Sequence, residues 1–164
     1  MAAMAKQVKA PAKTQATAPE SGPGQKVVIR YTDGRVQRAF LSKGDEASLI
    51  DSRTDTLVVK DSNGKPVKVE ASEIKAVFFV KSFEGNPDYS EFKVFSSRPG
   101  GKGIWVRVHF KDGEVIEGVA PNNFDTFSKS VFYMTPPDPG SNNHAVIVSK
   151  LYLTEMLVLG LAAD

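Results

Sequence analysis

Basic side chains recur near the start of the first patterned stretch of the chain. Arg30, Arg35, Arg38, Arg53 and Lys60 all fall between positions 30 and 60. Successive side chains of an extended segment point to opposite faces, so Arg30 lies on the face opposite its apolar neighbours. Arginine and lysine side chains bind phosphate, and aromatic rings between them stack on bases. These five residues are therefore candidate contacts for RNA or for a nucleotide.

Side chains suited to catalysis or metal binding are few and scattered. The chain has no cysteine, and its two histidines are His109 and His144. Neither histidine has a second histidine or a pair of carboxylates at the spacing of a metal site, and no glycine-rich loop precedes a helical segment. We therefore expect no catalytic residues, no metal and no cofactor, and we expect that the protein is not an enzyme.

The composition is that of a soluble globular protein. The chain has 164 residues, of which 41% are hydrophobic and 24% charged, and these shares are close to the average for folded domains. The lysines near the start are not followed by an apolar core, so we expect no secretory signal. The apolar stretch 151–163 is shorter than the roughly 20 residues of a spanning helix. We therefore expect a cytoplasmic protein without a membrane contact.

Residues 1–25 differ from the rest of the chain. They consist mostly of Ala, Lys, Pro, Gln, Thr and Gly and contain no aromatic residue. Such a segment cannot bury enough apolar surface to offset the entropy lost on ordering. We therefore predict a disordered N-terminal tail.

A first β unit is predicted at residues 26–82. Apolar and polar residues alternate over 27–31, and Asp33-Gly34 follows them. Asp-Gly between two alternating segments predicts a hairpin with a two-residue type I′ turn, and the return strand then points Val36 and Phe40 inward. Further strands of this unit are predicted at 56–60, 66–70 and 74–80. The last of these is nearly all apolar, which is typical of a strand buried on both faces.

A linker and a second β unit follow. The linker, 83–102, has turn sequences at both ends, and its centre, 89–95, is either one short helical turn or a strand. The second unit, 103–164, begins with an alternating segment that ends at Asp112-Gly113. Its later strands are predicted at 130–135, 145–149 and 151–159.

The second unit repeats the first. A shift of 79 residues superposes Asp33-Gly34 on Asp112-Gly113 and, near the other end, Val69 on Val148. The two units differ in charge, because residues 26–82 carry a net charge of +3 and residues 103–164 a net charge of −3. A unit of about 60 residues is marginally stable alone, so we expect the two units to pack together or the chain to oligomerise.

The second unit resembles the Sm-like family of small β-barrels. The resemblance rests on the run from Asp112-Gly113 through Gly118 to residues 124–127, and on the strand, the loop and the final hairpin that follow it. Gly118 matches the glycine that lets the second strand of that family bend, and Ala39 stands at this place in the first unit. The resemblance implies an all-β protein that consists of two tandem five-stranded, strongly bent Sm-like barrels after the tail.

Sm-like proteins form rings in which the fourth strand of one subunit pairs with the fifth strand of the next, and many bind single-stranded RNA through two loops. By this resemblance Asp125 and Phe127 match the Asp and the aromatic residue of the first RNA-binding loop, and Lys129 stands where the family has Asn. In the first unit, Arg53 and Asp55 stand where the family has the aromatic residue and the Asn.

The repeat and its charge pattern favour assembly through β-strand edges over RNA or nucleotide binding. The duplicated small units, the exposed strand edges and the opposite charges predict a non-catalytic assembly or adaptor module that associates with itself or with a protein partner through β-strand edges. RNA or nucleotide binding through the basic first unit is the alternative. The segment 74–87 also resembles bacterial domains of unknown function, which implies no mechanism.

Overall fold

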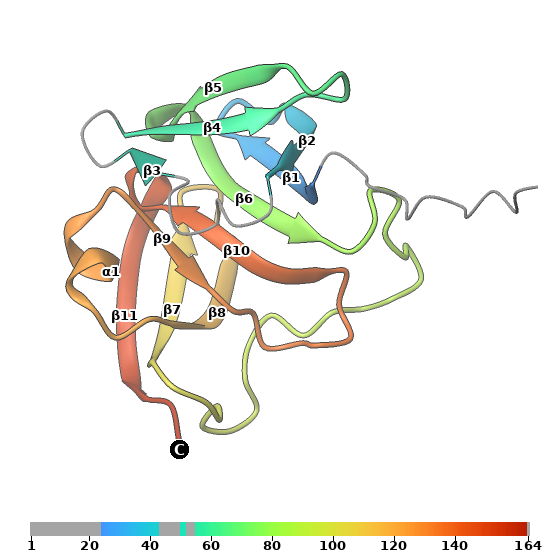
Figure 1. Ribbon diagram of the computed structural model, residues 1–164. Coiled ribbons are helices and arrows are strands. Elements are labelled where there is room, and N and C mark those ends of the chain that lie inside the picture. Colours follow the sequence, from blue (N-terminus) through green and yellow to red (C-terminus); the bar gives the residue numbers. More distant parts are fainter. Residues whose placement is uncertain (1–23, 43–49, 52–54, 164) are drawn as a thin grey trace, which may run out of the picture.

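The computed structural model of the protein describes residues 24–42, 50–51 and 55–163 (Figure 1). The predicted tail lies outside these residues except for Gly24 and Gln25, and the first strand begins at Gln25. The first half contains β1 (Gln25–Tyr31), β2 (Val36–Leu41), β3 (Ile50–Asp51), β4 (Thr56–Lys60), β5 (Pro66–Glu70), η1 (Ala71–Glu73) and β6 (Ile74–Val80). The second half contains β7 (Ile104–Phe110), β8 (Val115–Ala120), α1 (Phe124–Ser128), β9 (Val131–Met134), β10 (Asn143–Ser149), η2 (Lys150–Tyr152) and β11 (Leu153–Leu161).

The predicted all-β class is confirmed. One curled sheet has the order β3-β4-β2-β1-β6-β10-β9, with β5 paired to β4, and a smaller sheet has the order β11-β7-β8. Figure 1 shows the first half above the second, with β6 and β10 side by side between them. Among the described residues, no helix has the length and the apolarity needed to cross a membrane.

The hydrogen-bonded strands follow the same order in both halves. In the first half the order is β6-β1-β2-β4-β5. In the second half β11-β7-β8 is continued by β9, because Val119 and Thr135 exchange two backbone bonds of 2.9 Å, and then by β10. A short 3₁₀ turn, η1 or η2, leads into β6 and β11 respectively. The β6–β10 pair therefore joins the last strand of one half to the next-to-last strand of the other.

The hairpin turns differ from the predicted type. In the first hairpin the Tyr31 N–H donates to the Arg35 carbonyl at 2.9 Å, so three residues lie in the loop. Gly34 has a φ of 90°, whereas Asp33 is not among the residues with positive φ. A type I′ turn needs positive φ at both central residues, so that prediction was wrong, and the geometry is a type I turn followed by a left-handed glycine. Phe110 and Glu114 close the second hairpin in the same way.

The extra loop residue changes which side chains of β2 point inward. Ala39 lies opposite the buried Val27 and is itself buried, as is Leu41. Val36 is 63% exposed, which contradicts the inward position predicted for it. A shift of one residue in a strand moves every side chain to the other face. The three-residue loop therefore exchanges the predicted inner and outer faces of this strand.

Strand β6 separates two apolar cores, as its apolar sequence predicted. All seven of its residues are buried. Val77 and Phe79 face the first core together with Ile29 of β1, and Phe78 and its neighbours on the other face join the second core. Burial on both faces explains why this strand shows no alternation of apolar and polar residues.

Lys75 is the charged residue within this buried strand, and it ties the strand to the second hairpin. Its side chain is 7% exposed and its ammonium pairs with Asp112 at 2.5 Å and with Glu114. The ammonium also lies 4.6 Å from the centre of the Phe110 ring. Hydrogen bonds from Lys75 hold the pKa of Asp112 below its ordinary value. Two carboxylates and an aromatic face thus compensate the burial of this cation.

The segment predicted as a linker is held against the second half by buried carboxylates. Residues 89–95 form neither a helix nor a strand. The Phe95 N–H donates to the fully buried Glu117 carboxylate at 2.8 Å, and the Phe92 N–H donates to Asp138 at 3.0 Å. Because each acceptor belongs to a distant part of the chain, the path of this segment depends on tertiary contacts.

Candidate functional site

Three basic side chains share one face of the β1–β2 hairpin. Lys26, Val28 and Arg30 alternate with the core residues of β1, and Arg38 of β2 lies directly opposite Val28. Residues opposite each other in an antiparallel pair lie on the same face. Of the arginines predicted to contact a nucleotide, Arg30 and Arg38 are therefore brought together.

These cations lie against aromatic rings from distant parts of the chain. The guanidinium carbon of Arg30 is 5.1 Å from the centre of the Phe78 ring. Lys26 and Arg38 contact the ring of Phe83 at 5.8 Å and 5.5 Å. A cation over an aromatic face is stabilised by the ring quadrupole. We call Lys26, Arg30, Arg38, Phe78 and Phe83 the basic–aromatic face.

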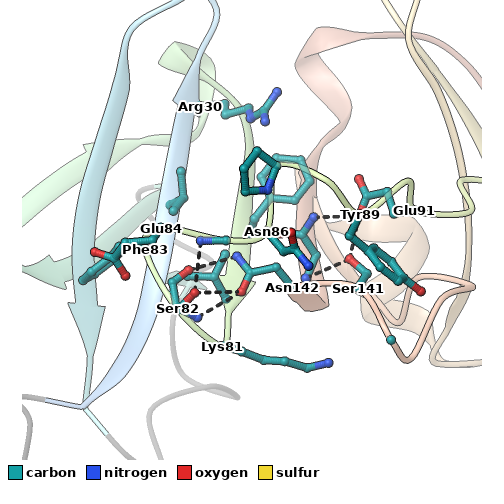
Figure 2. Close-up of a pocket in the computed structure, with 17 residues that line it drawn as sticks. Arg30, Lys81, Ser82, Phe83, Glu84, Asn86, Tyr89, Glu91, Ser141 and Asn142 are labelled. Atoms are coloured by element: carbon teal, nitrogen blue, oxygen red, sulfur yellow. Dashed lines mark hydrogen bonds between the residues drawn. The ribbon is translucent and has the colours of Figure 1, made fainter.

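A cavity of about 540 Å³ opens beside Arg30. Its apolar lining comes from Val28, Phe78 and Val80, and its polar walls come from residues 81–91 and 140–143. Figure 2 shows Phe83 and Glu84 on one side, Tyr89 and Glu91 on the other, and Arg30 above the turn between them. The volume falls within the range of about 300–1,000 Å³ typical of small-molecule sites.

Side-chain hydrogen bonds fix one wall of the cavity. The Asn142 carbonyl oxygen accepts from the Ser82 N–H at 3.0 Å, and the Asn142 amide donates to the Ser82 carbonyl at 2.9 Å. The Ser82 hydroxyl in turn accepts from the Gly85 N–H at 3.0 Å. These contacts join the end of β6 to the loop before β10, so the protein's own hydrogen bonds hold this wall in place.

Asp138 fixes the opposite wall. Its carboxylate is buried and accepts from the Tyr89 hydroxyl at 3.0 Å, from the Phe92 N–H at 3.0 Å and from the Gly140 N–H at 2.9 Å. The Phe92 N–H is the main cause that lowers the pKa of Asp138, and the hydrogen bond to Asp138 raises the pKa of Tyr89. Asp138 is therefore a structural carboxylate of the wall.

Arg30 differs from the other charged residues that line the cavity. Lys81 donates to the Pro139 carbonyl at 2.8 Å, and Glu91 accepts from the Ser141 hydroxyl at 2.5 Å. Among the described residues, none forms a hydrogen bond or an ion pair with the Arg30 guanidinium. A guanidinium has five N–H donors and pairs well with carboxylates and phosphates. Its donors are therefore available to a ligand.

The other basic residues predicted in the first unit lie elsewhere. Arg35 pairs with Asp33 at 2.6 Å at the tip of the first hairpin. Lys60 ends β4 and lies opposite Phe40 of β2. Arg53 falls outside the described residues. The described members of the predicted basic cluster are thus divided among the basic–aromatic face, the hairpin tip and the end of β4.

Asp125, Phe127 and Lys129 are brought together at α1. Lys129 pairs with Asp125 at 2.9 Å, and Phe127 is 52% exposed. The Lys150 ammonium donates to the Phe127 carbonyl at 2.7 Å, and burial lowers the pKa of Lys150. The loops before β9 and before β11 therefore meet. The Asp55 carboxylate of the first half accepts from the nearby Ser130 hydroxyl at 2.9 Å.

Sequence reasoning missed the residues that complete the cavity. Phe83, Tyr89, Asp138 and Asn142 are separated along the chain, and no motif connects them. The turn-forming polar residues at 85–88 and 138–143 mark both walls as loops. That local signal does not predict that the two loops meet.

A comparison with family models places residues 24–160 in a family of unknown function, DUF6982. The chain belongs to this family. The resemblance to domains of unknown function is thus confirmed. The region that matches DUF6982 includes strands of both halves of the structure and every residue that lines the cavity. Neither a curated protein nor a solved structure matches the chain. Within the part of the chain that the structure describes, no group of three or more His, Cys, Asp or Glu residues could hold a metal.

Proposed function

We propose that this protein is a non-catalytic assembly module, in which two Sm-like barrels fused in one chain join further copies of the chain edge to edge. The observation that carries the proposal is the β6–β10 pair, in which Val77 lies opposite Ile147 and Phe78 opposite Val146. Counted without the two-residue β3, β6 is the fifth strand of the first half, and β10 is the fourth strand of the second half. A fifth strand pairs with a fourth strand in the same way between neighbouring subunits of Sm-like rings.

The strand order supports the Sm-like part of the proposal. In both halves the fifth strand pairs with the first, and the first, second, third and fourth then follow in order. Gly118 of β8 also fits a sharply bent second strand, since a Cβ at this position would lie 2.7 Å from the Met134 sulfur and 2.9 Å from the Thr135 carbonyl. A close approach of this kind explains the need for glycine in a strand.

Two equivalent strands differ in burial, and this difference supports self-association. Every residue of β6 is buried, because the strand lies between the two cores and pairs with β1 on one edge and β10 on the other. Strand β11 holds the same place in the second half, yet among the described strands it pairs only with β7, and Val158, Leu159 and Leu161 are 52%, 37% and 56% exposed. Strand β5 likewise pairs only with β4 among these strands. Strand β11 of one copy therefore meets β5 of the next in the proposed assembly.

The internal repeat predicts the register of this contact. A shift of 79 residues carries Val148 to Val69 and Ala76 to Glu155. Val148 lies opposite Ala76 within the chain. We therefore expect Val69 of one copy opposite Glu155 of the next, and the neighbouring pairs follow in antiparallel order.

Backbone bonds at both ends of β5 indicate which of its N–H groups are free. The Lys65 carbonyl accepts from the Asp61 N–H at 2.9 Å, and the Ala71 N–H donates to the Asp55 carbonyl at 2.8 Å. Backbone groups alternate in direction along a strand. The odd-numbered residues of β5 thus face β4, and the N–H of Lys68 points to the unpaired edge.

The proposal is tested by the mass of the protein in solution. One chain has a mass of 17.8 kDa, and we expect sedimentation to give a multiple of this mass. Lys68→Pro removes the outward N–H of β5 without removing a β4–β5 bond, and Leu159→Glu places a charge on the edge of β11. Each variant should be monomeric, whereas the control Lys68→Ala keeps the N–H and should assemble like the wild type.

A mixing experiment tests whether the contact is head to tail. The Lys68→Pro chain keeps an intact β11 and the Leu159→Glu chain keeps an intact β5, so an equimolar mixture should form a 1:1 dimer that cannot grow further. Circular dichroism of each variant checks that the β fold is retained. A wild-type monomer at every concentration, or folded variants with the wild-type mass, would refute the proposal.

A further inference from the structure

We infer that the cavity beside Arg30 is a binding site for a small organic anion, whose phosphate or carboxylate group pairs with the Arg30 guanidinium. This inference is independent of the proposed assembly. The cavity is lined by residues of one chain, and the β5 and β11 edges do not contribute to its lining.

The charges around the cavity support an anion. Lys81 and Glu91 form hydrogen bonds with neighbouring groups of the walls. Within the part of the chain that the structure describes, the other two charged lining residues, Arg30 and the exposed Glu84, form no side-chain hydrogen bond or ion pair. Figure 2 shows Glu84 on the Phe83 side of the turn, below Arg30. Lys26 and Arg38 lie on the same sheet face as Arg30 and contact the ring of Phe83, which lines the cavity, so they add positive charge beside it. Nearby cations raise the local concentration of anions.

The position of Arg30 favours binding of the phosphate or carboxylate group of the ligand in one fixed orientation. Its guanidinium lies over the Phe78 ring, and that ring is 7% exposed at the apolar base of the cavity. This cation–π contact restricts the position of the guanidinium without using its N–H donors. Such a guanidinium can donate two parallel hydrogen bonds to a phosphate or a carboxylate.

The remaining lining favours a ligand with an uncharged organic body. Val28 and Val80 contribute apolar surface, and Asn86 and Ser141 contribute polar groups on the loops. The Asn86 side-chain carbonyl accepts from the Asp88 N–H at 3.1 Å, and no hydrogen bond is formed by its amide N–H groups among the described residues. Asn86 can therefore donate to a carbonyl or ring nitrogen of the ligand.

Isothermal titration calorimetry of the full chain tests the site with four probes: adenosine 5′-monophosphate, inorganic phosphate, benzoate and adenosine. We expect the monophosphate or benzoate to bind with a dissociation constant of about 1 mM or lower, and the result distinguishes a phosphate ligand from a carboxylate ligand. Adenosine, which has no anionic group, should bind at least about tenfold more weakly than the monophosphate.

Two arginine variants make the experiment specific. Arg30→Gln should weaken binding of the anion by about tenfold or more. The matched control Arg35→Gln removes an exposed arginine of the hairpin tip and should leave the affinity unchanged. The Lys68→Pro variant should bind like the wild type, which separates this site from the assembly contact. No binding of either organic anion at millimolar concentration, or equal binding by Arg30→Gln, would overturn the inference.

Discussion

Replacement of Glu117 by glutamine should destabilise the fold and release the segment that precedes β7. The Glu117 carboxylate is fully buried in β8. One oxygen accepts from the Phe95 N–H at 2.8 Å and the Trp105 indole N–H at 2.9 Å, and the other accepts from Arg107 at 2.8 Å and 2.6 Å. Glutamine keeps a single accepting oxygen, so its NH₂ group must face two of these donors.

The size of the effect follows from the bonds that are lost. Hydrogen bonds to a charged group contribute about 1.5–3 kcal/mol each. The Arg107 side chain is 38% exposed, so water compensates part of its loss. We expect Glu117→Gln to lower the free energy of unfolding by about 2–4 kcal/mol. For a chain of this length the melting temperature should fall by about 4–16 °C.

Urea unfolding measures the loss of stability, and amide hydrogen exchange locates it. The Phe95 N–H should be protected in the wild type and should exchange faster in the variant, because its acceptor is on Glu117. Glu73→Gln is a matched control at an exposed position and should change stability by less than about 0.5 kcal/mol. A loss below about 1 kcal/mol for Glu117→Gln with unchanged protection of Phe95 would refute this account.

Two further predictions concern acid and the bend in β8. In the folded protein the pKa is below its ordinary value for four carboxyl groups, those of Asp112, Glu114, Glu117 and Asp138. The ionised carboxylates therefore stabilise the fold fully at a pH above the pKa values of the unfolded chain. This stabilisation is lost as the pH falls through the lower pKa values of the folded protein. The urea midpoint should therefore be constant above about pH 5 and fall below about pH 4, and a constant midpoint down to about pH 2.5 would contradict this. Gly118→Ala should cost about 1–3 kcal/mol, because the new methyl group would lie within 3 Å of Met134 and Thr135. Gly100→Ala, which meets no atom within 4 Å, should be nearly neutral in the same urea titration.

The local pattern of apolar and polar residues indicates whether one face or both faces of a strand are buried, and for β6 and β7 this prediction is confirmed. The alternation at 104–110 is matched by alternating burial in β7, and the apolar run at 74–80 is matched by complete burial of β6. The first hairpin was predicted at the right place but with the wrong loop length. That error exposed Val36, since the inner face depends on whether two or three residues form the loop.

The candidate site was predictable only in part. The alternation of Arg30 with core residues predicts that it points outward, and the structure places it in the lining of the cavity. Its ring partner Phe78 belongs to β6, and the wall residue Asn142 belongs to the loop before β10. These partners come from strands that meet through long-range pairing, for which the sequence around Arg30 contains no signal.

The sequence by itself determined the all-β class and the outward position of Arg30. Each of these follows from local periodicity, because one side of a strand must be buried. The tertiary structure decided that β6 pairs with β10, that buried carboxylates order residues 89–95, and that Arg30 lies over the Phe78 ring beside a cavity. Such contacts depend on how distant strands pair and how their side chains fill the space between them, and neither is encoded by the pattern of a single segment.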